Sequence, residues 1–105
     1  MILFKCRADY KVGWGHLMRC ASIAQEINKT NKKTYLYCFN GKKILKKIGI
    51  NPFTKYFNER IQDNSKNTSY FLDFLKKKKI TKVIIDDPQI NSNIRNKIKK
   101  VGCKI

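Results

Sequence analysis

The residues best suited to chemistry gather in the first twenty positions of the chain. Its single histidine, His16, follows two glycines, Gly13 and Gly15, and precedes Arg19 by about one helical turn. Imidazole titrates near neutral pH, so His16 is a candidate general base. The alternative is a histidine at a helix start that only hydrogen-bonds a nearby backbone group.

The segments around His16 predict how it is positioned. The apolar run 2–4 predicts a buried strand, and apolar residues at three- and four-residue spacing predict an amphipathic helix after Gly15. Glycines at 13 and 15 allow positive φ or the close approach of another backbone or a ligand. A strand, a glycine turn and a helix make half of a βαβ unit, whose helix N-terminus presents free N–H groups to ligands. The spacing alone is weak, because it lacks the third glycine of a dinucleotide fingerprint and the Lys-Ser/Thr of a P-loop.

The order of these residues resembles the opening motif of the PseG family, the UDP-sugar hydrolases of pseudaminic acid biosynthesis. Residues 7–9 (Arg-Ala-Asp), 13–16 (Gly-Trp-Gly-His) and 19–20 (Arg-Cys) follow the family pattern in order, with a shorter spacer before the first glycine. The apolar run 83–85 ending in Asp86 is similar to a family strand that ends in Asp-His-Tyr. Here Asp87 and Pro88 replace the His-Tyr pair.

The resemblance implies a two-domain glycosyltransferase-B-like fold, of which residues 1–105 would form part of the N-terminal domain, without the C-terminal nucleotide-binding domain. It implies hydrolysis of the anomeric C–O bond of a UDP-linked diacetamido-trideoxyhexose. His16 would be the catalytic residue, and no metal or cofactor would be needed. The substrate-binding residues would be Arg7, Asp9, Gly13, Gly15, Arg19 and Asp86.

Several alternatives remain open from the sequence. The chain could be an inactive fragment, or one half of a split enzyme whose partner is a separate chain with the C-terminal domain. Related proteins also include glycosyltransferases, so transfer to an acceptor other than water is a further hypothesis. Arg7 and Asp9 could close the turn structurally. Asp86 could orient His16 or contact a sugar hydroxyl, and Asp87 could serve as a helix cap.

The composition excludes some classes of protein. No window is apolar enough for a membrane span and no secretory pattern follows Met1, so we expect a cytoplasmic protein without a membrane partner. The net charge of +17 suggests a polyanion partner, but the lysines are spread along the chain, so specific nucleic-acid binding is not expected. The four cysteines form no Cys-x-x-Cys pair, and with one histidine they predict buried reduced thiols rather than a zinc site.

Strands and helices are expected to alternate along the chain. This pattern predicts an α/β fold, a Rossmann-like open parallel sheet with helices on both faces and strand order 3-2-1-4-5. That order would place the 7–16 turn beside Asp86. The other expected strands are 34–39, a short edge strand within 50–57, 80–86 and 103–105. The other expected helices carry Ile44, Leu45 and Ile48 (capped at 40–41, stopped by Gly49), Tyr70 to Leu75 (capped by Thr68 or Ser69), and Ile90 to Val101 (ended by Gly102).

Overall fold

The structure, a computed structural model, describes residues 2–8, 14–59, 66–87 and 90–105. A four-stranded parallel sheet of order β3-β2-β1-β4 forms the middle layer. Its strands are β1 (Ile2–Cys6), β2 (Thr34–Tyr37), β3 (Lys55–Phe57) and β4 (Val83–Asp86). The helices are α1 (Gly15–Asn28), α2 (Gly41–Ile48), α3 (Lys66–Lys77) and α4 (Ser92–Lys100). The predicted α/β class and open parallel sheet are therefore confirmed.

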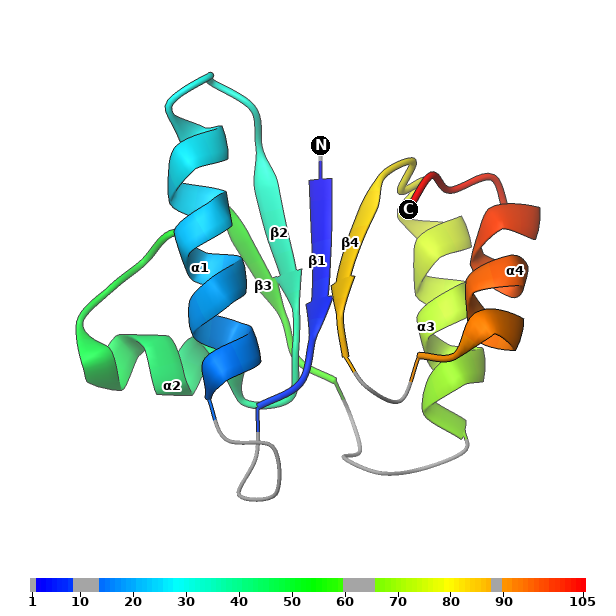
Figure 1. Ribbon diagram of the computed structural model, residues 1–105, viewed down its shortest axis with the longest axis horizontal. Coiled ribbons are helices and arrows are strands. Elements are labelled where there is room, and N and C mark those ends of the chain that lie inside the picture. Colours follow the sequence, from blue (N-terminus) through cyan, green and yellow to red (C-terminus); the bar gives the residue numbers. More distant parts are fainter. Residues whose placement is uncertain (1, 9–13, 60–65, 88–89) are drawn as a thin grey trace.

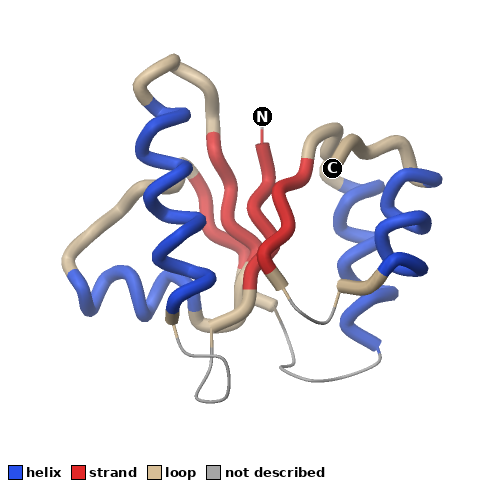
Figure 2. Tube along the Cα trace, viewed as in Figure 1, coloured by secondary structure: helices blue, strands red, loops and turns tan. Residues whose placement is uncertain are grey.

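Helices cover both faces of the sheet, as the alternating pattern predicts. Helices α1 and α2 lie on one face, and α3 and α4 lie on the other (Figure 1, Figure 2). Each face has its own core, because the side chains of a strand alternate between the two faces. Phe4 and Leu36 pack in the α1/α2 core, whereas Leu3 and Val83 pack in the α3/α4 core.

The strand order predicted from the sequence is observed. Strand β1 pairs with β2 on one side and with β4 on the other, both in parallel. A parallel bridge between Lys82 and Lys104 adds the beginning of a fifth strand beside β4, as expected for 103–105. Strand β4 is less buried than expected: Val83 is buried, but Ile84 to Asp86 are only half-buried, since that single bridge is the pairing on its outer side among the described residues.

Of the two predicted helix N-caps, the one at Thr68 or Ser69 is wrong and the one at Asn40 is confirmed in position only. Helix α3 begins at Lys66, so Thr68 and Ser69 lie inside it, because its first turn carries none of the apolar residues that revealed the helix. Asn40 does occupy the N-cap position of α2, but its side chain makes no capping bond and its backbone is left-handed, with φ 56°. The predicted stops at Gly49 and Gly102 are correct, with φ of 89° and 94°.

Gly41 is required by the packing of α2 against β2. A Cβ atom at this position would lie 2.7 Å from Cδ2 of Leu36 and 2.9 Å from Cβ of Cys38. Both neighbours are buried side chains. Helix α2 therefore lies so close to the sheet that only glycine fits at its first position.

We predict that Gly41→Ala lowers the free energy of unfolding by about 1–3 kcal/mol, because the added methyl group overpacks the core. Gly15→Ala is the matched control, since it is also the first residue of a helix but a Cβ there meets no atom of the described residues within 4 Å beyond its chain neighbours and its own helix backbone. Urea unfolding of both variants measures the difference. Equal stability of the two variants would contradict the close packing of α2.

Candidate active site at the β1–β4 edge

The candidate site lies where the strand order reverses. The chain runs from β1 outward to β2 and β3, and then returns to place β4 on the other side of β1. Open α/β sheets bind ligands outside the carboxyl ends of the strands at such a switch point. Helix α1 begins at this edge of the sheet (Figure 1), and Asp86 ends β4 at the same edge. The register pairs Asp86 with Cys6, the last residue of β1.

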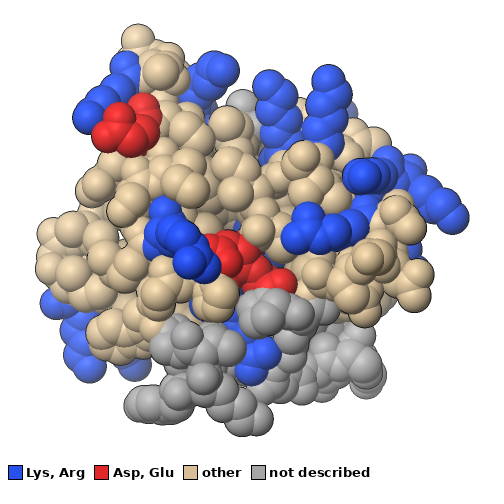
Figure 3. All heavy atoms as spheres, in the orientation of Figure 1, with Lys and Arg blue, Asp and Glu red and all other residues tan. Residues whose placement is uncertain are grey.

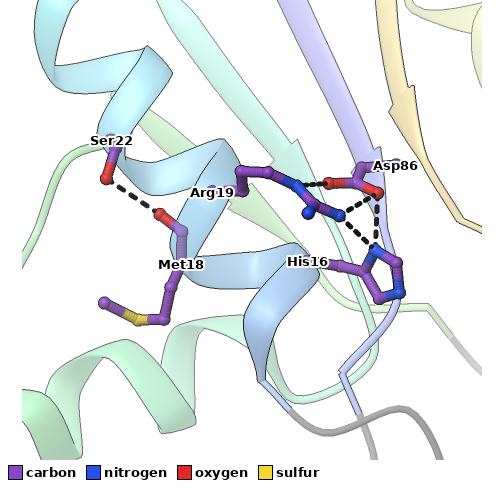
Figure 4. Close-up of polar contacts among 5 residues, drawn as sticks. All are labelled: His16, Met18, Arg19, Ser22 and Asp86. Atoms are coloured by element: carbon purple, nitrogen blue, oxygen red, sulfur yellow. Dashed lines mark hydrogen bonds and ion pairs between the residues drawn. The ribbon is translucent and has the colours of Figure 1, made fainter.

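Three side chains, His16, Arg19 and Asp86, meet there, and we call them the His16 cluster (Figure 4). His16 Nδ1 lies 2.5 Å from Asp86 Oδ1. Arg19 donates from Nε to Asp86 Oδ2 at 2.8 Å and from Nη2 to Oδ1 at 3.0 Å. The helix spacing of three residues brings Arg19 over the same carboxylate as His16. The predicted proximity of the Arg7–His16 turn to Asp86 is thus met at His16.

The charge state of Asp86 follows from these contacts. The hydrogen bonds from Arg19 are the main reason that the pKa of Asp86 lies below its usual value, with His16 adding to the effect and partial burial opposing it. Asp86 is therefore a carboxylate at neutral pH, a fixed negative charge against the imidazole.

The tautomer of His16 follows in turn. Two lone pairs cannot face each other at 2.5 Å, so a proton must lie between Nδ1 and the Asp86 carboxylate. Arg19 Nη2 also lies 2.9 Å from Nδ1, but a guanidinium is always protonated, so this contact is not a hydrogen bond while Nδ1 donates to Asp86. With the proton on Nδ1, neutral His16 keeps the lone pair of Nε2, which points away from Asp86 (Figure 4). An acid–base dyad of this kind holds a histidine ready to accept a proton.

Of the other predicted site residues, Arg7 and Gly15 lie at the same edge of the sheet. Arg7 follows β1 directly and is half-buried at the same edge. Gly15 is the first residue of α1 and does not adopt a positive φ. Beyond its chain neighbours and its own helix, no described residue lies within 4 Å of the position a Cβ would take, which suits the approach of a ligand. Asp9 and Gly13 lie outside the described residues. Trp14, whose side chain is 47% exposed, directly precedes the helix.

Sequence analysis did not identify a second polar cluster at this edge, formed by Lys5, Glu59 and Asp87. Lys5 is only 3% exposed and contacts both carboxylates, with its Nζ 3.1 Å from Glu59 Oε2 and in an ion pair with Asp87. Because successive residues of a strand face opposite sides, Asp86 and Asp87 serve different clusters. Asp87 is therefore not the N-cap of α4, a role taken by Asn91. A lysine within an otherwise apolar strand was the available signal, since a buried charge requires a partner.

Burial and the attraction between opposite charges have opposing effects on the pKa values of Lys5 and Glu59. For Lys5, burial by itself lowers the pKa, but the carboxylates of Glu59 and Asp87 outweigh it and hold the pKa above its usual value. For Glu59, burial is the larger effect and raises the pKa despite the attraction of Lys5. The cluster therefore stays intact only while Lys5 carries its charge.

The four cysteines are free and buried, as predicted. Hydrogen bonds with Cys20 and Cys38 are the main reason that the pKa of Cys6 is raised, so its thiol is not ionised. Among the described residues, no group of three or more His, Cys, Asp or Glu side chains is placed to hold a metal ion. None of the helices in the described ranges has the length and apolar character needed to cross a membrane.

Comparison with family models, with curated proteins and with solved structures finds no match to this chain. The resemblance to the PseG family stays a prediction from the sequence motifs.

We predict that Asp86→Asn shifts neutral His16 from the Nδ1–H toward the Nε2–H tautomer. The amide that replaces the carboxylate presents an NH₂ donor as well as a carbonyl, so it no longer requires a proton on Nδ1. Ring ¹⁵N chemical shifts of the neutral imidazole report the tautomer directly. Ser22→Ala, one turn beyond Arg19 on α1, is the control. A wild-type protein with the Nε2–H tautomer would contradict the assignment.

We also predict that Lys5→Met lowers the free energy of unfolding by about 3–5 kcal/mol near neutral pH, because two buried carboxylates lose their cation. Lys55→Met, at an exposed lysine of β3, is the control and should change stability little.

The loss of unfolding free energy caused by Lys5→Met should become smaller as the pH falls. The folded-state pKa of Glu59 is raised, so its protonated form stabilises the fold at low pH, and that contribution is lost as the pH rises through the raised value. Without Lys5 the stability depends more steeply on the protonation of Glu59. The difference in unfolding free energy between wild type and Lys5→Met should therefore increase from about pH 5 to pH 8. A gap that is constant over this range would show that Lys5 acts through packing alone.

Proposed function

We propose that this chain carries the catalytic histidine of a UDP-sugar hydrolase, one that cleaves the anomeric C–O bond of a UDP-linked diacetamido-trideoxyhexose. The supporting observation is the His16 cluster at the switch point of the sheet. The sugar and nucleotide are taken from the resemblance to the PseG family. The geometry supports the class of reaction, which is water activation by an oriented histidine.

In the proposed reaction His16 Nε2 accepts a proton from a water molecule. The water oxygen forms a bond to the anomeric carbon while the bond from that carbon to the phosphate oxygen breaks. The electron pair of the broken bond leaves on UDP, and the sugar gains the hydroxyl group. Asp86 stabilises the imidazolium that forms, through the Nδ1–H bond. Arg19 keeps the Asp86 carboxylate in place.

Helix α1 would help to bind the leaving phosphates. The N–H groups of residues 15–17 precede the first bond of the helix, which Met18 donates to the carbonyl of Trp14. Its first turn contains no acidic residue, and the nearby Asp86 carboxylate is already paired with Arg19, so the positive end of the helix dipole can still attract an anion. An anionic diphosphate is therefore favoured at this helix start. In this proposal the chain acts in the cytoplasm.

The test is UDP release from the UDP-linked sugar, measured with this chain alone and with the C-terminal domain of a PseG-family protein added. His16→Ala should reduce release by about 10²–10⁴-fold, the range of a general base. Ser22→Ala is the control on the same helix and should keep wild-type activity. Circular dichroism must show that both variants are folded.

Three other outcomes would count against the proposed hydrolysis. Undiminished release by His16→Ala would refute the role of the histidine. Transfer of the sugar to an added alcohol in preference to water would favour the glycosyltransferase alternative. The absence of release in every sample would refute the proposed reaction for this chain.

A further inference from the structure

A recess that no residue of the His16 cluster lines is found on the face of the sheet covered by α1 and α2. It is a cavity of about 410 Å³ between α2 and strands β2 and β3, and we call it the α2–β3 pocket. A drug-sized ligand requires a cavity of this order. Its lining includes Leu36, Asn40, Lys42, Lys43, Lys46 and Tyr56.

The pocket is positively charged. Three lysines of α2 line it, and none of the described residues that line it is acidic. Its polar atoms also include the amide side chains of Asn40 and Asn58. Lysine ammonium groups bind phosphate as point charges, so a phosphate group suits this rim.

The apolar part of the pocket wall comes from Leu36, which is buried in the α1/α2 core, and from Tyr56, which packs against that core. The ring of Phe57, the next residue of β3, faces the α3/α4 core instead. The Tyr56 ring is held in place by an edge-on contact with Phe53 and by its hydroxyl, which donates to Asn51 Oδ1 at 2.5 Å. Lys42 Nζ lies 5.8 Å from the centre of this ring. A fixed aromatic face beside a cation is suited to a ligand that has a flat ring and a phosphate.

The loops that close the pocket are joined by hydrogen bonds. The N–H of Asn40 donates to Asn58 Oδ1 at 2.7 Å, and the N–H of Cys38 donates to the carbonyl of Phe57 at 3.1 Å. A smaller cavity of about 350 Å³ continues past Lys42, Lys46 and Tyr56 toward Gly49. These three residues border both cavities, so the recess is a groove along α2 rather than an isolated gap.

The overall charge of the chain does not account for this arrangement. Figure 3 shows Lys and Arg side chains at many places around one face of the molecule rather than in a single stripe. The α2–β3 pocket differs because its lysines border a cavity with an aromatic wall. This combination, and not the lysine content, singles it out.

We propose that the α2–β3 pocket binds a phosphorylated small molecule with a planar ring, with the phosphate at Lys42, Lys43 and Lys46 and the ring against Tyr56. On binding, the Lys42 ammonium moves from the Tyr56 ring to the phosphate and leaves the ring face free. The site is separate from the His16 cluster, because its residues belong to α2, β2 and β3, whereas that cluster belongs to α1 and β4. It does not depend on the proposed hydrolase reaction.

The test measures binding of 5′-AMP, adenosine and inorganic phosphate by calorimetry at about 0.15 M salt, where exposed charges more than about 8 Å apart are screened. Substitution of all three pocket lysines by glutamine should weaken 5′-AMP binding by about tenfold or more, as expected for the loss of a charge-assisted hydrogen bond. The control replaces Lys76, Lys77 and Lys99 by glutamine, which removes the same charge from exposed positions on α3 and α4. It should leave the affinity within about twofold to threefold of wild type, since screening limits long-range effects.

The aromatic wall has its own test. Tyr56→Leu should weaken the binding of 5′-AMP but not of inorganic phosphate, whereas Tyr56→Phe, which keeps the ring, should bind 5′-AMP like wild type. Thermal unfolding must show that all variants are folded. Equal losses in the two lysine variants, equal affinity for phosphate and 5′-AMP, or no saturable binding of 5′-AMP would each overturn the proposal.

Discussion

The arrangement of the candidate site depends on the pairing of β1 with β4. These strands are separated by nearly eighty residues, yet their register places Cys6 opposite Asp86. The same pairing puts Asp86 within reach of the helix that follows β1, where His16 and Arg19 lie on one face. The side chain after Asp86 turns to the opposite face and meets Lys5. One strand pairing thus assembles both polar clusters.

The two clusters use buried charge in different ways. In the His16 cluster Asp86 is partly exposed, and a guanidinium that is always charged fixes its negative state. In the Lys5 cluster the groups are nearly inaccessible, so their charges are retained only by mutual attraction. In the first arrangement no described residue is hydrogen-bonded to Nε2 of His16, the atom that accepts a proton in the proposed reaction. The second has no free access and serves to hold the ends of β1 and β4 and the loop after β3 together.

The layered fold could be predicted from the sequence because hydrophobic periodicity reports burial directly. The strand order, and with it the approach of Asp86 to the His16 turn, follows from the alternation of strands and helices. The helix stops at Gly49 and Gly102 follow from the positive φ that glycine allows. The cap at Thr68 or Ser69 was wrong, and Asn40 holds the N-cap position without a side-chain capping bond, because capping depends on local dihedral angles that composition does not determine. The Lys5 cluster was missed since its partners lie 54 and 82 residues away, and no local pattern connects them.

The α2–β3 pocket shows why cavities resist prediction from sequence. Its lysines look like an ordinary solvated helix face, and Tyr56 looks like a strand residue on an edge. They form a recess because Gly41 lets α2 approach Leu36 closely at its first turn, while Gly49 ends the helix and sends the chain back to β3. The cavity lies between the close end of the helix and the returning strand. The sequence gives the residue types that line such a site. Whether a space remains between α2 and β3 depends on how closely α2 packs at Gly41, which the sequence does not show.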